Sequence, residues 1–132
     1  MDLEGKVRRV TTRERGLAAE DRALQHLQAR GLRMVARNFK TPGRGGGEID
    51  LIMRERDGTL VFVEVRLRSR SDRGGAGASI TATKRRRIVL AARHFLLRCR
   101  SMPPCRFDAV LIDGPEGELQ WLRAAFDAGD AG

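Results

Sequence analysis

The sequence predicts an α/β domain in which a mixed sheet is flanked by helices. Apolar residues recur at helical spacing in two segments, 15–30 and 81–98, and β-rich runs lie between and after them. The order helix, three strands, helix, strand is typical of helices packed on a mixed sheet. The 132 residues suffice for one core, so we expect a single domain at 14–128 behind a flexible basic arm at 1–13.

The first helix and strand are predicted from residue spacing and from glycine. Leu17, Leu24 and Leu27 recur at helical intervals, and Gly31 ends the helix. Residues 32–38 are predicted to form a strand, and the proline and glycines of residues 41–47 predict a flexible loop.

A β-hairpin is predicted next, because Asp57-Gly58 is a turn signal between two β-rich runs at 48–54 and 60–67. With Asp57 at the centre of the turn, one face of the hairpin is apolar and carries Ile49, Leu51, Met53, Val61, Val63 and Val65. On the opposite face Asp50 lies across from Glu64, with Cβ atoms roughly 5 Å apart.

The second half is predicted to add one more helix and two more strands. Residues 68–79 are rich in Arg, Ser and Gly and predict a mobile basic loop. A helix at 81–98 is followed by a strand at 106–112 and a short last strand at 119–122 before a frayed tail.

The charge of the chain favours a polyanionic partner. The net charge is +9, and all but three of the 26 basic residues are arginines, whose planar side chains suit phosphate. A GC-rich genome also replaces Lys with Arg, so composition alone supports nucleic-acid binding and genome base composition equally as the cause of the arginine excess.

Three other classes of protein or site are disfavoured. No apolar run approaches the roughly 20 residues of a membrane span, and no export signal precedes the domain, so we expect a cytoplasmic protein. Cys99 and Cys105, with His26 and His94 elsewhere in the chain, lack zinc-site spacing and are interpreted as structural.

The carboxyl pair of the hairpin predicts a metal site. Like charges directly opposite each other destabilise a sheet, and a divalent cation such as Mg²⁺ or Mn²⁺ neutralises them. Asp50 and Glu64 are therefore the candidate ligands of an ion that activates water against a phosphodiester. Glu48, on the same strand face, is a further candidate.

Glu20 is a third candidate ligand, because it falls in the apolar stripe of Leu17, Leu24 and Leu27. A carboxylate is rarely buried unless it is paired or bound to a metal. The alternative is an arginine partner, or a buried stripe centred on Ala19, Ala23 and Leu27, and the spacing slightly favours this alternative.

Cations surround the predicted site. Arg66 shares a face with Glu64, and a salt bridge to Asp50 or Glu64 is its simplest interpretation. Lys84 begins a run of four basic residues at the start of the second helix, where backbone N–H groups attract phosphate. Such runs are usually a solvated helix face.

Several sequence blocks resemble the YraN family, bacterial proteins assigned to the PD-(D/E)XK, restriction-endonuclease-like superfamily. The blocks are Gly16-Leu17-Ala18-Ala19-Glu20 with Ala23, Ala36-Arg37-Asn38, Gly47-Glu48-Ile49-Asp50-Leu51-Ile52, Phe62-Val63-Glu64-Val65-Arg66, Lys84, Arg106-Phe107-Asp108 and Ala125-Phe126. The resemblance implies a restriction-endonuclease-like αβββαβ core, with metal ligands at Asp50 and Glu64 and the helical carboxylate at Glu20. Archaeal Holliday-junction resolvases share this arrangement and bind branched DNA as dimers, so a homodimer is expected by analogy.

One departure from the family pattern bears on activity. Arg66 stands where the family usually has a lysine that orients the attacking water, and a guanidinium cannot give and take a proton. Lys84 is the candidate substitute, reaching in from the second helix. Another departure, Ile49 in place of the proline of the superfamily name, is common.

The expected function is Mg²⁺-dependent (or Mn²⁺-dependent) hydrolysis of DNA phosphodiesters, selective for structure rather than sequence. Candidate catalytic residues are Glu20, Asp50, Glu64, Arg66 and Lys84. Candidate nucleic-acid contacts are Arg68, Arg70, Arg73, Arg85, Arg86 and Arg87. The alternative function is a catalytically inactive nucleic-acid-binding module on a nuclease fold, for which Arg66 is the best evidence, and a protein-interaction scaffold is a weaker third hypothesis.

Overall fold

The computed structural model describes residues 9–68, 80–114 and 117–131. Its elements run in the order α1 (Thr12–Ala29), β1 (Arg33–Lys40), β2 (Glu48–Arg54), β3 (Leu60–Arg68), α2 (Ala82–Leu96), β4 (Cys105–Asp113), β5 (Leu119–Phe126) and a 3₁₀ turn η4 (Ala128–Ala131). The predicted αβββαβ order is confirmed. The predicted contacts Arg70 and Arg73 lie outside the described residues, as do residues 1–8 of the predicted arm.

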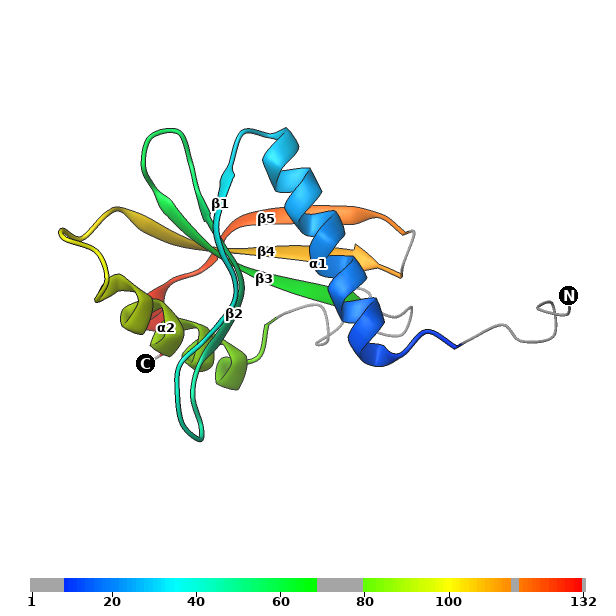
Figure 1. The fold of residues 1–132 in the computed structure, drawn as a ribbon, viewed down its shortest axis with the longest axis horizontal. Helices are drawn as coiled ribbons and strands as arrows, with labels where there is room; N and C mark the ends of the chain where they lie inside the picture. Colours follow the sequence, from blue (N-terminus) through cyan, green and yellow to red (C-terminus); the bar gives the residue numbers. More distant parts are fainter. Residues whose placement is uncertain (1–8, 69–79, 115–116, 132) are drawn as a thin grey trace, which may run out of the picture.

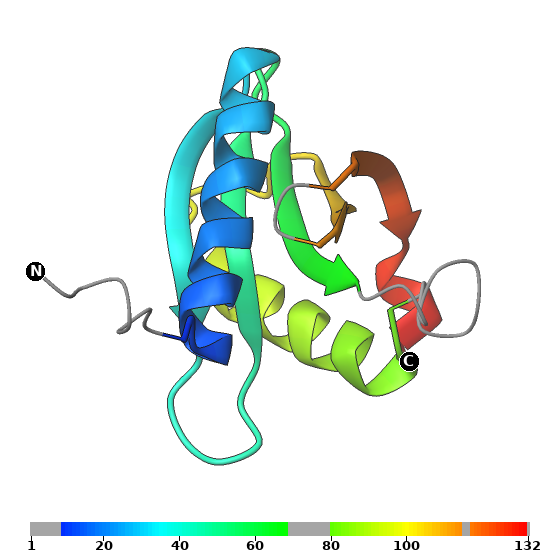
Figure 2. The ribbon, with the colours of Figure 1, turned by 90° about the vertical axis from the view of Figure 1, so that its right-hand side faces the viewer.

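The strands form one mixed sheet in the order β1-β2-β3-β4-β5 (Figure 1). Neighbouring strands are antiparallel, except that β3 and β4 are parallel and are joined through α2. Each helix packs on its own hydrophobic cluster, α1 on one face of the sheet and α2 on the other. The connection between β1 and β2 projects from one end of the molecule (Figure 2).

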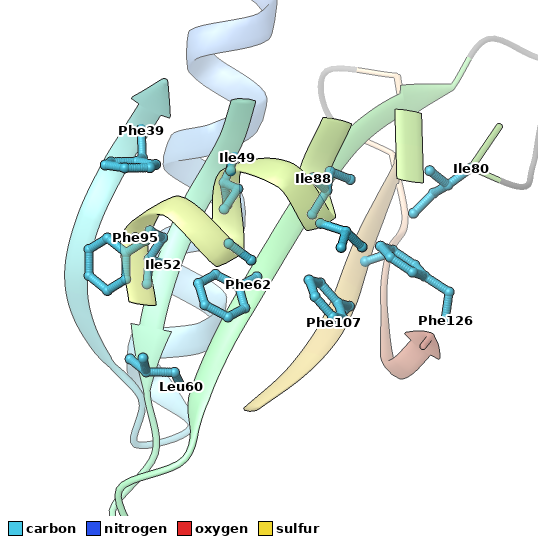
Figure 3. Packing of buried hydrophobic residues seen from close by; sticks show 14 of the residues in the cluster. Phe39, Ile49, Ile52, Leu60, Phe62, Ile80, Ile88, Phe95, Phe107 and Phe126 are labelled. Carbon is cyan, nitrogen blue, oxygen red and sulfur yellow. The ribbon is translucent and has the colours of Figure 1, made fainter. Parts of the chain in front are cut away.

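The cluster under α2 is built from aromatic side chains. All five phenylalanines of the chain belong to it, and Figure 3 shows them between α2 and the sheet. The rings of Phe62 and Phe107 stack with centroids 5.5 Å apart, and those of Phe107 and Phe126 at 4.9 Å. Phe95 brings α2 into the cluster by packing edge-on against Phe62. These stacked and edge-on contacts fix the helix against the sheet, including β3, the strand that carries Glu64.

The cluster under α1 corrects the predicted helix face. The buried residues of the helix are Ala19, Ala23 and Leu27, whereas Leu17 is 37% exposed. The stripe centred on Ala19, Ala23 and Leu27, which was the alternative, is therefore the one that packs. Its alanines are small, so α1 can lie close to the apolar side chains of β2, β3 and β4, which are Leu51, Met53, Val61, Val63, Val110 and Ile112.

The first helix begins earlier than predicted, at Thr12 rather than Arg15, because Thr11 caps it. The hydroxyl of Thr11 accepts the backbone N–H of Glu14 at 3.1 Å, and the carboxylate of Glu14 accepts the backbone N–H of Thr11 at 2.9 Å. This capping box satisfies two N–H groups that the helix leaves unpaired. The apolar spacing used for the prediction does not report such a cap.

The last strand is longer than predicted and ends at Phe126 rather than Leu122. Asp108, fully buried on β4, accepts hydrogen bonds from the indole N–H of Trp121 and the backbone N–H of Ala124, both at 2.9 Å. Ala124 has a positive φ of 50°, and the register of β4 and β5 shifts nearby. The Asp108 carboxylate thus accepts a backbone hydrogen bond where the strand pairing is irregular, and β5 continues past the irregularity.

The hairpin register is confirmed, with Leu51 paired to Val63 and Met53 to Val61. The predicted face is wrong for Ile49, which lies in the cluster under α2, while Leu51 and Met53 lie under α1. The neighbouring strand explains the difference, because Asn38 has a positive φ of 53° and interrupts the alternation of β1. Phe39 follows Asn38, pairs with Ile49, and lies in the same cluster.

Two expectations about the rest of the chain can be compared with the structure. No helix among the described residues is long and apolar enough to cross a bilayer. Cys99 and Cys105 are both free thiols, and Cys105 is exposed.

Replacing Leu27 with Ala is expected to lower the free energy of unfolding by about 2 to 5 kcal/mol, because the side chain is fully buried and leaves a cavity. The matched control is Leu17→Ala, the same change in the same helix, with an expected loss below about 1 kcal/mol. Urea denaturation followed by circular dichroism measures both. Equal losses in the two variants would contradict the observed helix face.

Candidate metal centre

Asp50 lies just beyond the last backbone-paired residues of β2 and β3, where its side chain takes over a hydrogen bond from β3. The last paired residues are Leu51 and Val63, and just beyond them the backbone N–H of Val65 donates to Oδ2 of Asp50 at 2.8 Å. The carboxylate therefore lies on the side of β3 that faces β2. Its charge acts on Glu64 of that strand and on Glu20 of α1, and raises the pKa of both. Asp50 is the group that connects the two sides of the sheet.

Asp50 and Glu64 form a carboxyl pair that shares a proton, with Glu64 buried and Asp50 half-buried. The Glu64 side chain is only 5% exposed. Burial, then the charge of Asp50, raises the pKa of Glu64 to about 8, and burial also raises the pKa of Asp50. The protonated Glu64 donates a hydrogen bond to the Asp50 carboxylate, which lowers the pKa of Asp50 against the effect of burial. At neutral pH the pair therefore holds one proton in place of a second negative charge.

Lys84 supplies the positive charge nearest Glu64. Its Nζ lies 3.2 Å from Oε2 of Glu64, as expected for a lysine reaching in from the second helix. Thr81 caps that helix by accepting the backbone N–H of Lys84 at 3.1 Å, so the start of α2 sets the position of the side chain. Burial lowers the pKa of Lys84, but the charges of Glu64, Asp50 and Glu48 outweigh burial and raise it. The ammonium is therefore charged.

Glu20 lies near the pair but is bound by an arginine, as the alternative for this residue proposed. Its carboxylate contacts Nε of Arg37 at 3.3 Å, and Arg37 also binds Asp21 at 2.7 Å and the carbonyl oxygen of Leu17 at 3.2 Å. The side chain of Glu20 is 14% exposed. Burial and the charge of Asp50 raise the pKa of Glu20, and hydrogen bonds from Arg37 and Asn38 oppose them.

Arg37 and Asn38 are the site residues for which residue spacing predicted no role. Both orient Glu20, and Asn38 carries the positive φ that breaks the strand alternation beside Asp50. The block Ala36-Arg37-Asn38 was a signal, because it belongs to the family resemblance, but no role was assigned to it.

The structure does not pair Arg66 with either carboxylate of the hairpin. The Nε atom of Arg66 is buried and has no hydrogen-bond partner among the described residues, and on β3 the residue lies beside Leu111 of β4. The salt bridge to Asp50 or Glu64 that the sequence favoured for Arg66 is therefore wrong. Glu48 is exposed at the start of β2, and its charge raises the pKa of Asp50.

The predicted nucleic-acid contacts differ in their surroundings. Arg68 is bound to Asp113 at 2.9 Å and is 11% exposed, so it presents little surface to a partner. Arg85 is half-buried and its Nε has no partner within the described ranges, whereas Arg86 and Arg87 are exposed on the first turns of α2. The start of α2 is therefore the most accessible basic surface among the predicted contacts that the structure describes.

A small cleft lies between the first half of α1 and the strands β1 and β2. Its volume is about 280 Å³, and it is lined by Arg13, Gly16, Leu17, Glu20, Asn38, Lys40 and Glu48. A larger hollow of about 560 Å³ lies at the other end of the hairpin, between the end of α1 and the β2–β3 turn. Within the described ranges, no three acidic, histidine or cysteine side chains are grouped closely enough to hold a metal. Asp50 and Glu64 are thus a two-carboxylate site, with Glu20 held aside by Arg37.

Replacing Glu64 with Gln is expected to flatten the pH dependence of stability in metal-free buffer. The pKa of Glu64 is about 8 in the folded chain against an ordinary value of 4.5, so the folded chain keeps a proton that the unfolded chain has released. This contribution is complete below pH 4.5 and is lost as the pH rises to about 8.

Urea unfolding in the presence of a chelator, over this pH range, measures the effect. The control variant Asp57→Asn, at the exposed turn of the hairpin, should keep the wild-type fall in stability. A Glu64→Gln variant with that same fall would show that Glu64 titrates at its ordinary value.

Comparison with known proteins matches residues 19–112 to the model described as "Uncharacterised protein family UPF0102". This span includes Glu20, Asp50, Glu64 and Lys84. The UPF0102 protein of Paracidovorax citrulli (strain AAC00-1) is 71% identical over 125 residues, which cover 95% of this chain and 91% of that protein. Those of Acidovorax sp. (strain JS42) and Cupriavidus pinatubonensis (strain JMP 134 / LMG 1197) are 70% identical over 118 residues and 57% over 125, covering 89% and 92% of this chain and 88% and 94% of theirs. The chain belongs to the UPF0102 family.

Proposed function

We propose that this chain is a divalent-metal-dependent endonuclease that hydrolyses DNA phosphodiester bonds, with Asp50 and Glu64 as the metal ligands. The observation that carries the proposal is the carboxyl pair of the buried Glu64 and the half-buried Asp50, in which the pKa of Glu64 is raised to about 8. Two carboxyl groups held together by a proton and largely removed from water are costly to place in a sheet. A group of this kind in an otherwise apolar hairpin favours a functional site.

The chemistry of the donor set fits a hard divalent cation. Mg²⁺ and Mn²⁺ prefer carboxylate oxygens, and Mg²⁺ usually keeps several waters while using only one or two carboxylates. An ion at Asp50 and Glu64 would take the place of the shared proton. When bound, it would supply a more acidic water and offset negative charge on the phosphate.

The remaining side chains fit the needs of phosphodiester hydrolysis. The charged Nζ of Lys84, 3.2 Å from Glu64, can stabilise negative charge that develops on a phosphate oxygen. Glu20 is held at the edge of the site by Arg37 and Asn38, where its carboxylate can accept a hydrogen bond from water. Arg66 is a second cation on the strand of Glu64, and its buried Nε has no partner in the part of the chain that the structure describes.

The fold and the charge support a nucleic-acid substrate. The αβββαβ order is the core expected for restriction-endonuclease-like proteins. Arg86 and Arg87 are exposed where α2 begins, and a helix N-terminus attracts phosphate. The chain has no tyrosine and one tryptophan, so recognition by base stacking is not favoured. We therefore expect recognition of nucleic-acid shape rather than of sequence.

The second candidate function is a nuclease-like fold that binds DNA without cleaving it. Two observations favour it. Arg66 stands in the position where the YraN pattern has lysine, and the Lys84 ammonium, 3.2 Å from Glu64, balances the remaining negative charge of the carboxyl pair without a metal. The two candidates differ in whether Asp50 and Glu64 are needed for cleavage or only for stability.

Asp50→Asn and Glu64→Gln are each expected to reduce cleavage of branched and linear DNA at least about 100-fold in Mg²⁺ or Mn²⁺. The matched control is Asp57→Asn, which removes one carboxylate at the far turn while the amide oxygen can still accept the N–H of Thr59. Fluorescently labelled substrates on denaturing gels give the rates. Persistent cleavage in both variants would reject the assigned ligands, whereas DNA binding by the unsubstituted chain without any cleavage would favour the second function.

Lys84→Met is expected to lower kcat about 100-fold with a smaller effect on KM, because its charge is needed as the phosphate becomes more negative. The control is Arg86→Met, which removes an exposed cation from the same turn of α2 without touching Glu64. Single-turnover rates at saturating enzyme distinguish the two variants. Equal losses would assign Lys84 to general DNA binding.

A further inference from the structure

The β1–β2 connection at 41–47 projects beyond the two helices at the end of the molecule where β2 begins (Figure 2). Asp50 is the third residue of β2, so the loop enters the sheet next to the carboxyl pair. Within the described chain, the opposite turn of the hairpin, around Asp57, lies at the far end of β2. A partner that contacts the 41–47 loop would therefore also be placed close to Asp50.

The base of this loop is held firmly. The backbone N–H of Thr41 donates to the carbonyl oxygen of Gly47 at 3.0 Å, and the N–H of Gly47 donates to the hydroxyl of Thr41 at 2.6 Å. Gly47 is buried against α2, where a Cβ atom would collide with the carbonyl oxygen of Arg87 and lie 2.6 Å from the nitrogen of Ala91. The loop is thus clasped at its base and seated on the helix that carries Lys84.

The tip of the loop is slender and carries one long side chain. Gly43 and Gly45 have positive φ angles of 90° and 68°, and a Cβ atom at either position would meet nothing within 4 Å. The described chain leaves open space at both positions, so the positive φ, and not a close neighbour, is what favours glycine there. Between these glycines stands Arg44, which is exposed and makes no hydrogen bond or ion pair with another described residue.

Cations continue from the tip toward the carboxyl pair. Lys40 is exposed where β1 enters the loop, and Arg13 lies across the small cleft from it. The cleft also contains Glu20, which feels the charge of Asp50. A phosphate backbone lying along this end would meet positive charge at the loop tip and at the cleft.

We infer that the 41–47 loop inserts Arg44 into the minor groove of duplex DNA while the flanking backbone lies at Asp50 and Glu64. The inference rests on the proposed function, for which it specifies duplex DNA as the substrate class. The minor groove is roughly 6 Å wide, which suits a chain with glycines on both sides of one arginine. Narrow A·T-rich minor grooves concentrate negative potential and attract inserted arginine.

Fluorescence anisotropy of DNA binding by the Asp50→Asn chain in a chelating buffer tests the inference without cleavage. In this Asp50→Asn chain, the further substitution Arg44→Ala is expected to weaken binding to an A-tract duplex roughly tenfold. It is also expected to abolish the preference of the protein for the A-tract over an alternating G·C duplex of equal length. Netropsin, which occupies the minor groove, should compete with the chain that has Arg44 and not with the Arg44→Ala chain. Added Thr41→Val, which removes the hydroxyl that accepts the Gly47 N–H, should give an intermediate loss.

The matched control is Arg56→Ala, which removes one exposed arginine from the opposite turn of the hairpin. It should change affinity less than about twofold, and unfolding curves establish that every variant is folded. Equal effects of Arg44→Ala and Arg56→Ala, indifference to netropsin, or the same Arg44 dependence on duplex RNA, whose minor groove is wide and shallow, would overturn the inference. Binding that does not depend on Arg44, or no duplex binding at all, overturns the inference and leaves the proposed function intact, because the cleavage assays of Asp50→Asn and Glu64→Gln test that function separately.

Discussion

The site depends on two carboxyl groups that the hairpin register brings together on neighbouring strands. Leu51 pairs with Val63, so Asp50 and Glu64 follow as the next residues of their strands. The Asp50 carboxylate is fixed by the N–H of Val65, at the point where the side-chain alternation of β2 is interrupted. Burial then makes two full charges unfavourable, and a shared proton with the nearby ammonium of Lys84 neutralises the pair.

The aromatic core and the start of β2 together position the Lys84 ammonium. Phe95 and Phe62 hold α2 on the sheet, and the backbone of Gly47 approaches the helix so closely that no side chain fits between them. The cap at Thr81 sets where α2 begins and so where Lys84 leaves the helix. The distance between Lys84 and Glu64 is therefore a property of the packed core rather than of a mobile surface side chain alone.

The opposite side of the site is built around an irregularity in β1. The positive φ of Asn38 interrupts the strand alternation, and its neighbour Arg37 binds Glu20 and Asp21 of α1. Asp50 is thereby within electrostatic reach of Glu20 as well as of Glu64, although the helices that frame the site cover opposite faces of the sheet. Backbone strain of this kind is often found at functional sites, where surrounding packing maintains it.

The sequence by itself determined the order of elements, the hairpin register and the proximity of Asp50 to Glu64, because period-two alternation and a turn signal are local properties of the chain. Only the tertiary structure decided that Glu20 is bound by Arg37, that Ile49 lies under α2, and that Arg66 has no carboxylate partner. These outcomes depend on which elements pack together and on one irregular residue in β1, which a pattern within a single segment does not encode. The reach of Lys84 to Glu64 lies between the two cases, since the sequence predicted the side chain and the packing of α2 set its distance.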